Sequence, residues 1–258
     1  MPAAEVRVQY GTDSAQFGDL YLPAGMGPHP VVVLIHGGCW RAMYDLAPLG
    51  SLCRALTGLG IAVWNLEYRR VGNGGGWPAT FADVGAGADY LRRLAADYPL
   101  DLRRVIAAGH SAGGHLALWL AARRRLPSIS PVYCADPLQL RGVLSLAGLA
   151  DLAQAVARDL CGGMVVELLG GTPEVVPDRY QQASPHALLP LGVPQVLITG
   201  MDDDVVAVDF VSSYAAAAAE LGDAVQPMIM PDVGHFEPVM SGSAAWPTVR
   251  DAVLQLLG

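Results

Sequence analysis

Short, mostly apolar runs recur along this chain, and a helical segment follows almost every one of them. The runs lie at residues 31–35, 61–66, 105–108, 143–146, 194–199 and 225–230. Runs of this length without polar alternation are typical of strands buried on both faces of a sheet. The helical segments cover residues 46–59, 81–98, 111–125, 206–221 and 246–257. Because strands and helices alternate, we predict an α/β fold whose mostly parallel central sheet carries helices on both faces.

Two segments depart from this alternation. Residues 6–10 and 17–22 flank a Gly11-Thr12-Asp13 turn, which predicts an N-terminal hairpin. Residues 151–189 contain two helical fragments, paired glycines and several prolines, and we expect them to form a small cap over one edge of the sheet. With 258 residues, 52% of them hydrophobic, residues 1–258 are predicted to form a single domain with this cap-like insertion.

The charge of the chain restricts its partners. The net charge is −8, and the one dense basic cluster, residues 123–125, ends a predicted helix, where cations are favourable. A nucleic-acid partner is therefore not expected. The chain has no apolar stretch of about 18 residues that would span a bilayer, and its first seven residues lack the pattern of a signal peptide. We expect a cytoplasmic protein with a small-molecule partner and no membrane partner, and the sequence is compatible with a homodimer.

The four cysteines give no sign of a shared structural role. Cys39, Cys53, Cys134 and Cys161 are widely separated, with no CxxC pair. This spacing predicts neither a disulfide framework nor a zinc site.

The first chemical motif is Gly109-His110-Ser111-Ala112-Gly113-Gly114, which matches the pattern G-x-S-x-G. The pattern alone is short enough to occur by chance in a glycine-rich chain. Here it follows a predicted strand and opens a predicted helix, as a nucleophile elbow requires. Small residues flank the serine, where backbones must approach closely. We therefore predict that Ser111 is a nucleophile; the alternative is an ordinary glycine-rich turn.

The second motif, His36-Gly37-Gly38-Cys39-Trp40, directly follows the first aliphatic run. Main-chain N–H groups in such a turn can stabilise the oxyanion of a tetrahedral intermediate. The predicted donors are the N–H groups of Gly38, Cys39 and Ala112. His36 is expected to brace the loop through side-chain hydrogen bonds rather than to act in catalysis.

Candidates for an acid and a base follow the last two runs. Three adjacent carboxylates, Asp202, Asp203 and Asp204, come after residues 194–199, and His235 comes after residues 225–230. Metal sites usually draw ligands from separate segments, so one carboxylate that orients a histidine is the simpler interpretation. Among the histidines, His235 alone gives the chain order Ser, Asp, His found with this elbow. The residues alone leave open which aspartate takes part.

These motifs resemble the α/β-hydrolases, in particular the carboxylesterase branch near the hormone-sensitive-lipase-like esterases and the kynurenine formamidases. The resemblance rests on His36–Trp40, on residues 109–117 and on Gly200-Met201-Asp202-Asp203-Asp204-Val205-Val206, which is similar to G-x-x-D-x-x-V. It implies the α/β-hydrolase fold, a Ser111–Asp203–His235 catalytic triad and no cofactor or metal. Cysteine at position 39 departs from the family pattern and would narrow the oxyanion loop or make it reactive. Glu67-Tyr68-Arg69 lacks the full lipase-like pattern, which loosens the link to that group more than to the formamidases.

The expected function is hydrolysis of carboxylic esters of small to medium acyl compounds through an acyl-enzyme. Hydrolysis of N-formylkynurenine by an aryl-formamidase is the alternative enzyme, and a non-catalytic receptor with a hydrolase fold is the alternative of another class. Side chains near the motif loops are expected to bind substrate: Trp40, Tyr68, Trp77, His186 and Phe236.

Overall fold

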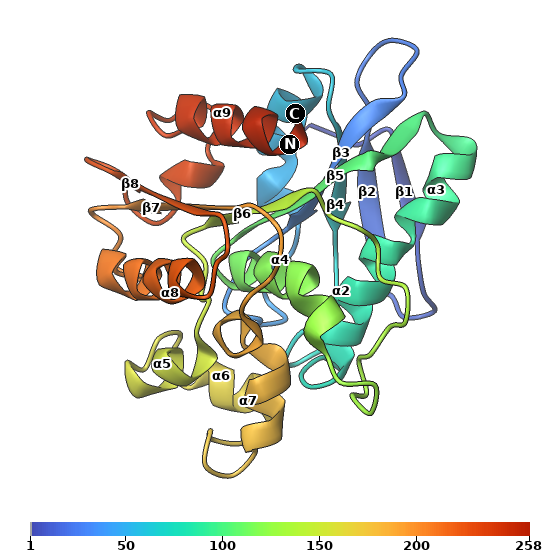
Figure 1. Ribbon diagram of the computed structural model, residues 1–258. Coiled ribbons are helices and arrows are strands. Elements are labelled where there is room, and N and C mark those ends of the chain that lie inside the picture. Colours follow the sequence, from blue (N-terminus) through green and yellow to red (C-terminus); the bar gives the residue numbers. More distant parts are fainter. Residues whose placement is uncertain (1) are drawn as a thin grey trace.

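A single twisted sheet forms the centre of the molecule (Figure 1). The computed structural model describes residues 2–258. Met1, which belongs to the segment tested for a signal-peptide pattern, lies outside the described residues. Within residues 2–258 the sheet has eight strands in the order β1-β2-β4-β3-β5-β6-β7-β8. The strands are β1 (Val6–Gln9), β2 (Phe17–Tyr21), β3 (His29–Ile35), β4 (Ala62–Leu66), β5 (Leu100–His110), β6 (Gly142–Leu146), β7 (Gln195–Gly200) and β8 (Val225–Met230). Pairing is antiparallel for β1–β2 and β2–β4 and parallel from β4 to β8, which confirms the predicted mostly parallel sheet.

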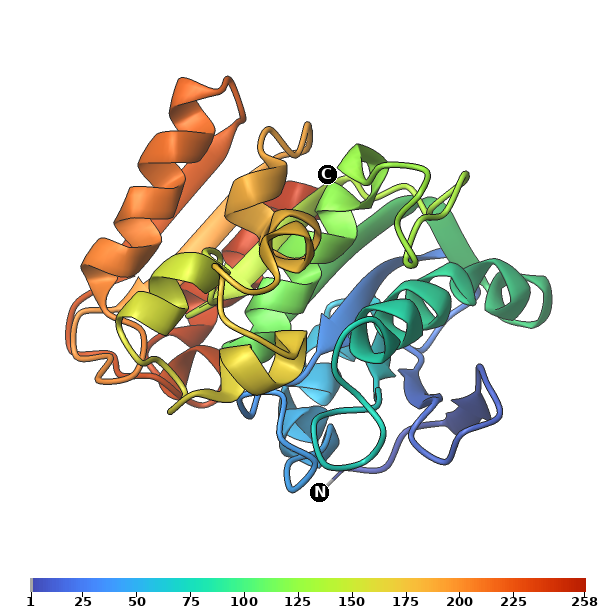
Figure 2. The same ribbon diagram turned by 90° about the horizontal axis from the view of Figure 1, so that it is seen from below.

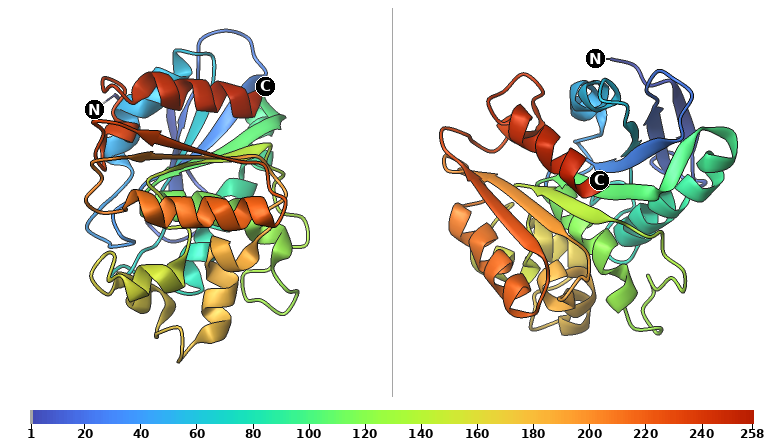
Figure 3. Two further views of the ribbon diagram at one scale, coloured as in Figure 1. Left: turned by 60° about the vertical axis from the view of Figure 1, so that its left-hand side comes forward. Right: turned by 45° about the horizontal axis from the view of Figure 1, so that its top comes forward.

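Helices cover both faces of this sheet. On one face lie α1 (Gly50–Thr57) and α9 (Trp246–Leu257), and on the other α2 (Ala79–Asp89), α4 (Ala112–Ala122) and α8 (Val208–Glu220); α9 and α8 are seen on opposite sides in Figure 3. Successive side chains of a strand point to opposite faces. In β3, Val31 and Val33 join the core beneath α4, whereas Val32 and Leu34 join the core beneath α1 and α9. This double burial explains the unbroken aliphatic run in β3.

Several elements differ from their predicted bounds. The helix expected over residues 81–98 is two helices, α2 and α3 (Leu91–Asp97), which meet at Tyr90. The helix expected over residues 46–59 begins with a short 3₁₀ turn, η1 (Ala47–Leu49). β5 begins five residues earlier than its aliphatic run, because ion pairs from the buried Asp101 to Arg103 and Arg104 accommodate the charged residues near its start. A second 3₁₀ turn, η2 (Arg123–Arg125), ends α4, and a fourth, η4 (Glu237–Val239), precedes α9.

The inserted segment 151–189 forms α5 (Leu152–Ala157), α6 (Met164–Leu169), α7 (Pro177–Ala183) and the 3₁₀ turn η3 (Pro185–Leu188). The 3₁₀ turn η3 packs against α4 and α8, and the helices of the insertion lie on that side of the sheet (Figure 2). Two α4 side chains donate hydrogen bonds to this segment: Trp119 Nε1 to the Gln182 carbonyl and His115 Nε2 to the Ala183 carbonyl, both at 2.9 Å. Buried polar side chains of α4 therefore fix the insertion in place.

β8 is the outermost strand on its side of the sheet and pairs only with β7 among the described strands. It carries Pro227, which lies opposite Leu197 of β7. Proline lacks the main-chain N–H and is tolerated in a sheet at such an edge. None of the helices within residues 2–258 combines the length and apolar character needed to cross a membrane.

Candidate active site

Ser111 occupies a sharp turn between β5 and α4. Its backbone has φ 54° and ψ −120°, a conformation that non-glycine residues rarely adopt. A Cβ added to Gly109 would lie 2.1 Å from the Gly113 carbonyl oxygen, and one added to Gly113 would lie 2.1 Å from the Ile35 carbonyl oxygen. Both positions therefore require glycine, and the turn packs directly against the end of β3.

Asp203 and His235 form a buried hydrogen-bonded pair. His235 Nδ1 lies 2.9 Å from Oδ2 and 3.1 Å from Oδ1 of Asp203. The main-chain N–H groups of Val205 and Val206 donate to Asp203 Oδ1 at 2.9 and 2.7 Å. Burial raises the pKa of the Asp203 carboxyl, but the hydrogen bonds from His235, Val206 and Val205 outweigh it and hold that pKa below its usual value. Asp203 is thus ionised and fixes the orientation of the imidazole.

The three predicted side chains meet at one cavity. Ser111 follows β5, Asp203 follows β7 and His235 follows β8, and the parallel strands bring these loops to the same edge of the sheet. Ser111 and His235 line a cavity of 350 Å³, and Asp203 lies behind the histidine ring. The Ser111 hydroxyl and the His235 ring share the cavity without a direct hydrogen bond. Active sites without substrate commonly show such loose contacts, which tighten when substrate binds.

The loop after β3 presents main-chain N–H groups at this cavity. Gly38, Cys39 and Trp40 have φ of 106°, 49° and 53°, three consecutive residues in left-handed backbone. Gly38 and Cys39 line the cavity, and their N–H groups donate to no group within residues 2–258. Ala112 begins α4, and the first N–H groups of a helix lack partners within the helix. The N–H groups of Gly38 and Cys39 are therefore free to bind a ligand oxygen, whereas Ala112 is buried and does not line the cavity.

A disulfide joins this loop to the inserted segment. Cys39 is bonded to Cys161, 122 residues later in the chain, in the turn between α5 and α6. The expectations that the cysteines form no disulfide and that Cys39 offers a reactive thiol are therefore wrong, whereas the expected narrowing of the loop stays a prediction. Sequence spacing could not reveal the pair, because the fold alone brings the two loops together. Cys53 is buried and Cys134 half-buried, and both are free. The cytoplasmic location stays a prediction, and this disulfide does not favour it, because disulfides are rare in cytosolic proteins.

A buried charge cluster supports the loop from beneath. Oε1 of Glu67 accepts hydrogen bonds from His36 Nε2 at 3.0 Å and from the Tyr68 N–H at 2.8 Å, and pairs with Arg70 at 2.6 Å. The Tyr68 hydroxyl donates to the His36 carbonyl at 2.9 Å. Burial raises the pKa of Glu67, but the hydrogen bond and charge of His36 and the charge of Arg70 lower it below the usual value. His36 has the bracing contacts expected of it, whereas no motif indicated that Glu67 is the shared partner of these contacts.

His110 has a role that the sequence did not reveal. Its Nε2 donates to the main-chain carbonyl of His235 at 2.8 Å, and the two rings lie 4.6 Å apart. Burial, together with the nearby His235, lowers the pKa of His110 to about 4. His110 is therefore neutral near neutral pH and holds the His235 loop. Its position varies freely in the elbow pattern, so the motif carries no signal for this contact.

Of the five side chains expected to bind substrate, only Phe236 lines the cavity. Trp40 and Tyr68 are fully buried in the core, and Trp77 packs edge-on against the Phe81 ring. His186 lies near Asp151, with 3.6 Å between Nδ1 and Oδ2, outside the cavity lining. Trp40 and Tyr68 are aromatic anchors beneath the loops, because large apolar rings are stabilised most by full burial, whereas Trp77 is only partly buried.

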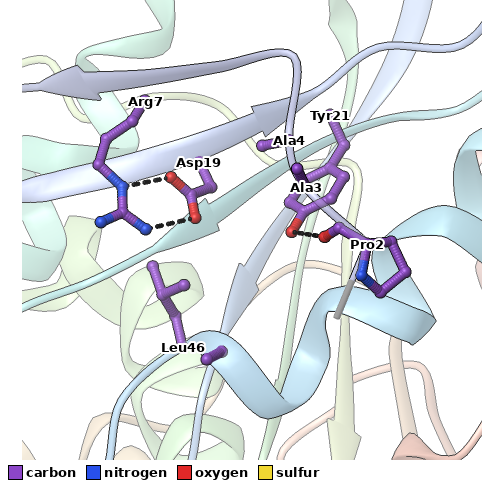
Figure 4. A pocket seen from close by; sticks show the side chains of 8 residues that line it. Pro2, Ala3, Ala4, Arg7, Asp19, Tyr21 and Leu46 are labelled. Atoms are coloured by element: carbon purple, nitrogen blue, oxygen red, sulfur yellow. Dashed lines mark hydrogen bonds and ion pairs between the residues drawn. The ribbon is translucent and has the colours of Figure 1, made fainter.

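A second cavity, of 320 Å³, lies beside the N-terminal hairpin (Figure 4). Its charged groups already neutralise each other: Arg7 donates to both carboxylate oxygens of Asp19, at 2.7 and 2.8 Å. Its lining includes Tyr21, whose hydroxyl donates to the Pro2 carbonyl at 3.2 Å. The cavity therefore lacks the activated groups that surround Ser111.

Comparison with known proteins agrees with this geometry. The BD-FAE family profile matches residues 18–216, which span β2 to α8 and include the elbow, the loop after β3 and Asp203. The chain belongs to the BD-FAE family. Membership in the α/β-hydrolase superfamily is thereby confirmed, whereas the match does not single out the formamidase branch.

Relatives and solved structures extend the comparison. The chain is 26% identical to esterase LipC of Mycobacterium tuberculosis, over 97% of this chain and 64% of that protein. It is 26% identical to the probable isoprenylcysteine alpha-carbonyl methylesterase ICMEL1 of Arabidopsis thaliana, over 86% of this chain and 48% of that protein. This BD-FAE protein thus spans about half to two thirds of those relatives. A truncated carbohydrate esterase from gut microbiota superposes with a TM-score of 0.82 at 21% identity, covering 99% of both chains, which shows a shared fold.

Proposed function

We propose that this protein is a carboxylesterase that hydrolyses esters of small to medium acyl compounds. The observation that carries the proposal is the convergence of Ser111, the Asp203–His235 pair and the unpaired N–H groups of Gly38 and Cys39 on one cavity. Two relatives that carry esterase names point to the same reaction class. The 350 Å³ volume favours small and medium substrates, because ligand pockets of that size hold molecules of limited length.

In the proposed mechanism, Ser111 Oγ forms a bond to the ester carbonyl carbon while His235 Nε2 takes the hydroxyl proton. Asp203 keeps the other ring nitrogen protonated and stabilises the imidazolium. The tetrahedral intermediate collapses, the bond to the alcohol oxygen breaks, and His235 protonates the departing alcohol. Water then attacks the acyl-enzyme with His235 again as base, which releases the carboxylic acid and restores Ser111.

The oxyanion of each tetrahedral intermediate would accept hydrogen bonds from the N–H groups of Gly38, Cys39 and Ala112. Such a donor contributes about 3–4 kcal/mol to transition-state stabilisation. A receptor that only holds a ligand would have no use for both these donors and a buried Ser–His–Asp arrangement. No contact in the cavity favours a formamide over an ester, so the ester is the substrate proposed.

The test is the turnover of 4-nitrophenyl acetate, butyrate and octanoate by wild type and by Ser111→Ala. We expect the substitution to lower kcat by about 10⁴-fold or more, because it removes the nucleophile, and we expect the octanoate to be the poorest substrate. A fluorophosphonate probe should label wild type and leave the variant unlabelled. Near-normal turnover by the folded variant would refute the proposal, and a faster reaction with N-formylkynurenine than with every ester would transfer it to the formamidases.

A further inference from the structure

One cation faces the Ser111 cavity without a carboxylate partner. Arg41 lines this cavity, two residues after Cys39. Its Nη2 donates to the Cys161 carbonyl at 3.3 Å, while its Nε is buried and has no hydrogen-bond partner within residues 2–258. A guanidinium has five N–H donors, and a buried donor without an acceptor is costly. Much of the hydrogen-bonding capacity of Arg41 is therefore unused by the protein.

Other arginines near the site are neutralised. Arg70 pairs with Glu67 at 2.6 Å, and Arg69 pairs with Asp83 at 2.7 Å. Among the residues that the structure describes, no acidic side chain forms an ion pair with Arg41. The contrast sets Arg41 apart as a cation available to a ligand.

The position of Arg41 is held from both sides. Its main-chain N–H donates to the Gly38 carbonyl at 3.0 Å, within the loop that offers the predicted oxyanion donors. Its guanidinium contacts the Cys161 carbonyl, and the Cys39–Cys161 disulfide joins the same two segments. The guanidinium is therefore placed before substrate arrives, which limits the entropy lost on binding.

The remaining acidic groups at the cavity do not cancel this charge. Asp203 is paired with His235. Asp45 also lines the cavity, but it is exposed and its Oδ1 accepts the N–H of Ala47 at 3.0 Å. Water screens an exposed carboxylate strongly, so Asp45 offsets the charge of Arg41 only weakly.

We propose that Arg41 determines specificity by binding a carboxylate of the substrate, so that the preferred esters are anionic. This inference rests on the proposed esterase function. Arginine binds carboxylates through paired N–H···O bonds, and charge-assisted bonds of this kind are stronger than neutral ones. The rest of the substrate would contact apolar groups of the same cavity, such as Leu49, Val205 and Phe236.

The test compares two pairs of esters that differ in charge. The first pair consists of the acetate esters of 4-hydroxybenzoate and of the neutral 4-hydroxybenzamide, so the charge lies on the leaving group. The second pair consists of the 4-nitrophenyl monoester of adipic acid, whose free carboxylate is charged, and 4-nitrophenyl 6-methylheptanoate, in which an isopropyl group replaces that carboxylate. Here the charge lies on the acyl group. In at least one pair we expect Arg41→Gln to lower kcat/KM for the anionic ester about 10- to 100-fold more than for its neutral partner. For each pair, the ratio of kcat/KM for the anionic ester to kcat/KM for the neutral ester is compared between wild type and Arg41→Gln. This comparison cancels the intrinsic reactivity of the esters.

Three further variants sharpen the test. Arg41→Lys keeps the charge and should keep part of the preference. Asp45→Asn removes the opposing carboxylate of the cavity lining and should raise the anionic-to-neutral ratio only slightly, because water screens Asp45. Arg250→Gln removes the same charge from α9, where Arg250 pairs with Asp251 at 2.7 Å, and should leave both ratios unchanged.

The outcomes separate this inference from the proposed function. If wild type hydrolyses all four esters and Arg41→Gln alters neither ratio, Arg41 only supports the inserted segment and the inference is overturned. If wild type hydrolyses none of the four faster than Ser111→Ala does, the esterase proposal itself fails.

Discussion

At the scale of single residues, surroundings rather than residue type separate the groups of the site. Asp202, Asp203 and Asp204 are adjacent and chemically identical, yet Asp203 alone is buried and accepts two main-chain N–H bonds and the His235 ring. Its neighbours are exposed. A strand end displays successive side chains in different directions, so one carboxylate faces the histidine and the others face water.

Asparagine at these positions should therefore have unequal effects. We expect Asp203→Asn to lower kcat about 10³- to 10⁴-fold, because the amide no longer enforces the required His235 tautomer. The matched control is Asp204→Asn, whose exposed side chain should matter little. Steady-state kinetics with one 4-nitrophenyl ester, together with circular dichroism to verify folding, provide the measurement. Equal losses in the two variants would show that Asp203 is not the triad acid.

Residues whose role follows from local chain order were predictable, and residues whose role arises from contact between distant segments were not. Ser111 and His235 follow strands whose parallel arrangement was predicted from the apolar runs, whereas the choice of Asp203 among three adjacent aspartates rested on the family resemblance. The contact of His110 with the His235 carbonyl, and that of Arg41 with Cys161, join segments far apart in sequence. Aromatic side chains beside the motifs were misplaced, since proximity in sequence does not tell whether a ring faces the cavity or the core.

At the scale of secondary structure, α4 links the nucleophile to the inserted segment. Its first residue follows Ser111, and all of its residues are buried. Such a helix has no polar face. Its existence was therefore predictable from its length and apolar character, but which of its faces packs against the sheet was not. It carries His115, whose ring lies edge-on to Trp40 and Phe81 with centroids 5.3 and 5.8 Å away. Burial lowers the pKa of His115 to about 4, although its hydrogen bond to Ala183 opposes this.

The buried histidines predict acid sensitivity. Because the folded-state pKa values of His110 and His115 are about 4, below the unfolded value of about 6.5, the unfolded chain binds more protons between these limits. Their contribution to stability is therefore complete above pH 6.5 and is lost as the pH falls towards 4, up to about 3 kcal/mol for each histidine. Urea unfolding at pH 7.5, 6 and 5 should show this loss.

A variant assigns the effect to one ring. His115→Gln removes the titrating group while its amide N–H can still donate towards the Ala183 carbonyl. The dependence of its unfolding free energy on pH between 7.5 and 5 should be shallower than that of wild type. An identical slope would mean that His115 does not supply the expected protons.

At the scale of the whole molecule, the insertion and the sheet are joined around the cavity. The Cys39–Cys161 bond connects the loop after β3 with the α5–α6 turn, and α4 contributes the hydrogen bonds of Trp119 and His115. The layered architecture was predictable because every strand and helix must bury an apolar face. The placement of the insertion was not, since it depends on buried polar contacts that no periodic pattern encodes.

The disulfide should contribute measurably to global stability. A cross-link that closes a loop of 122 residues restricts the unfolded chain, and removal of a native disulfide typically costs about 2–5 kcal/mol. We expect Cys39→Ala/Cys161→Ala to lower the free energy of unfolding by this amount, measured by urea titration without reductant. The matched control is Cys134→Ala, which removes a free thiol. A double variant as stable as wild type in oxidising buffer would contradict the assignment.

The outer strand has a consequence for how copies of this protein meet. The free edge of a sheet is a template on which another chain can add its own strand, the route to edge-to-edge aggregation. The outer edge of β8 offers a row of main-chain N–H groups, and Pro227, which has no N–H, interrupts this row midway. A strand that added to β8 would lose one main-chain hydrogen bond at Pro227. This loss protects the molecule against edge-to-edge aggregation through β8.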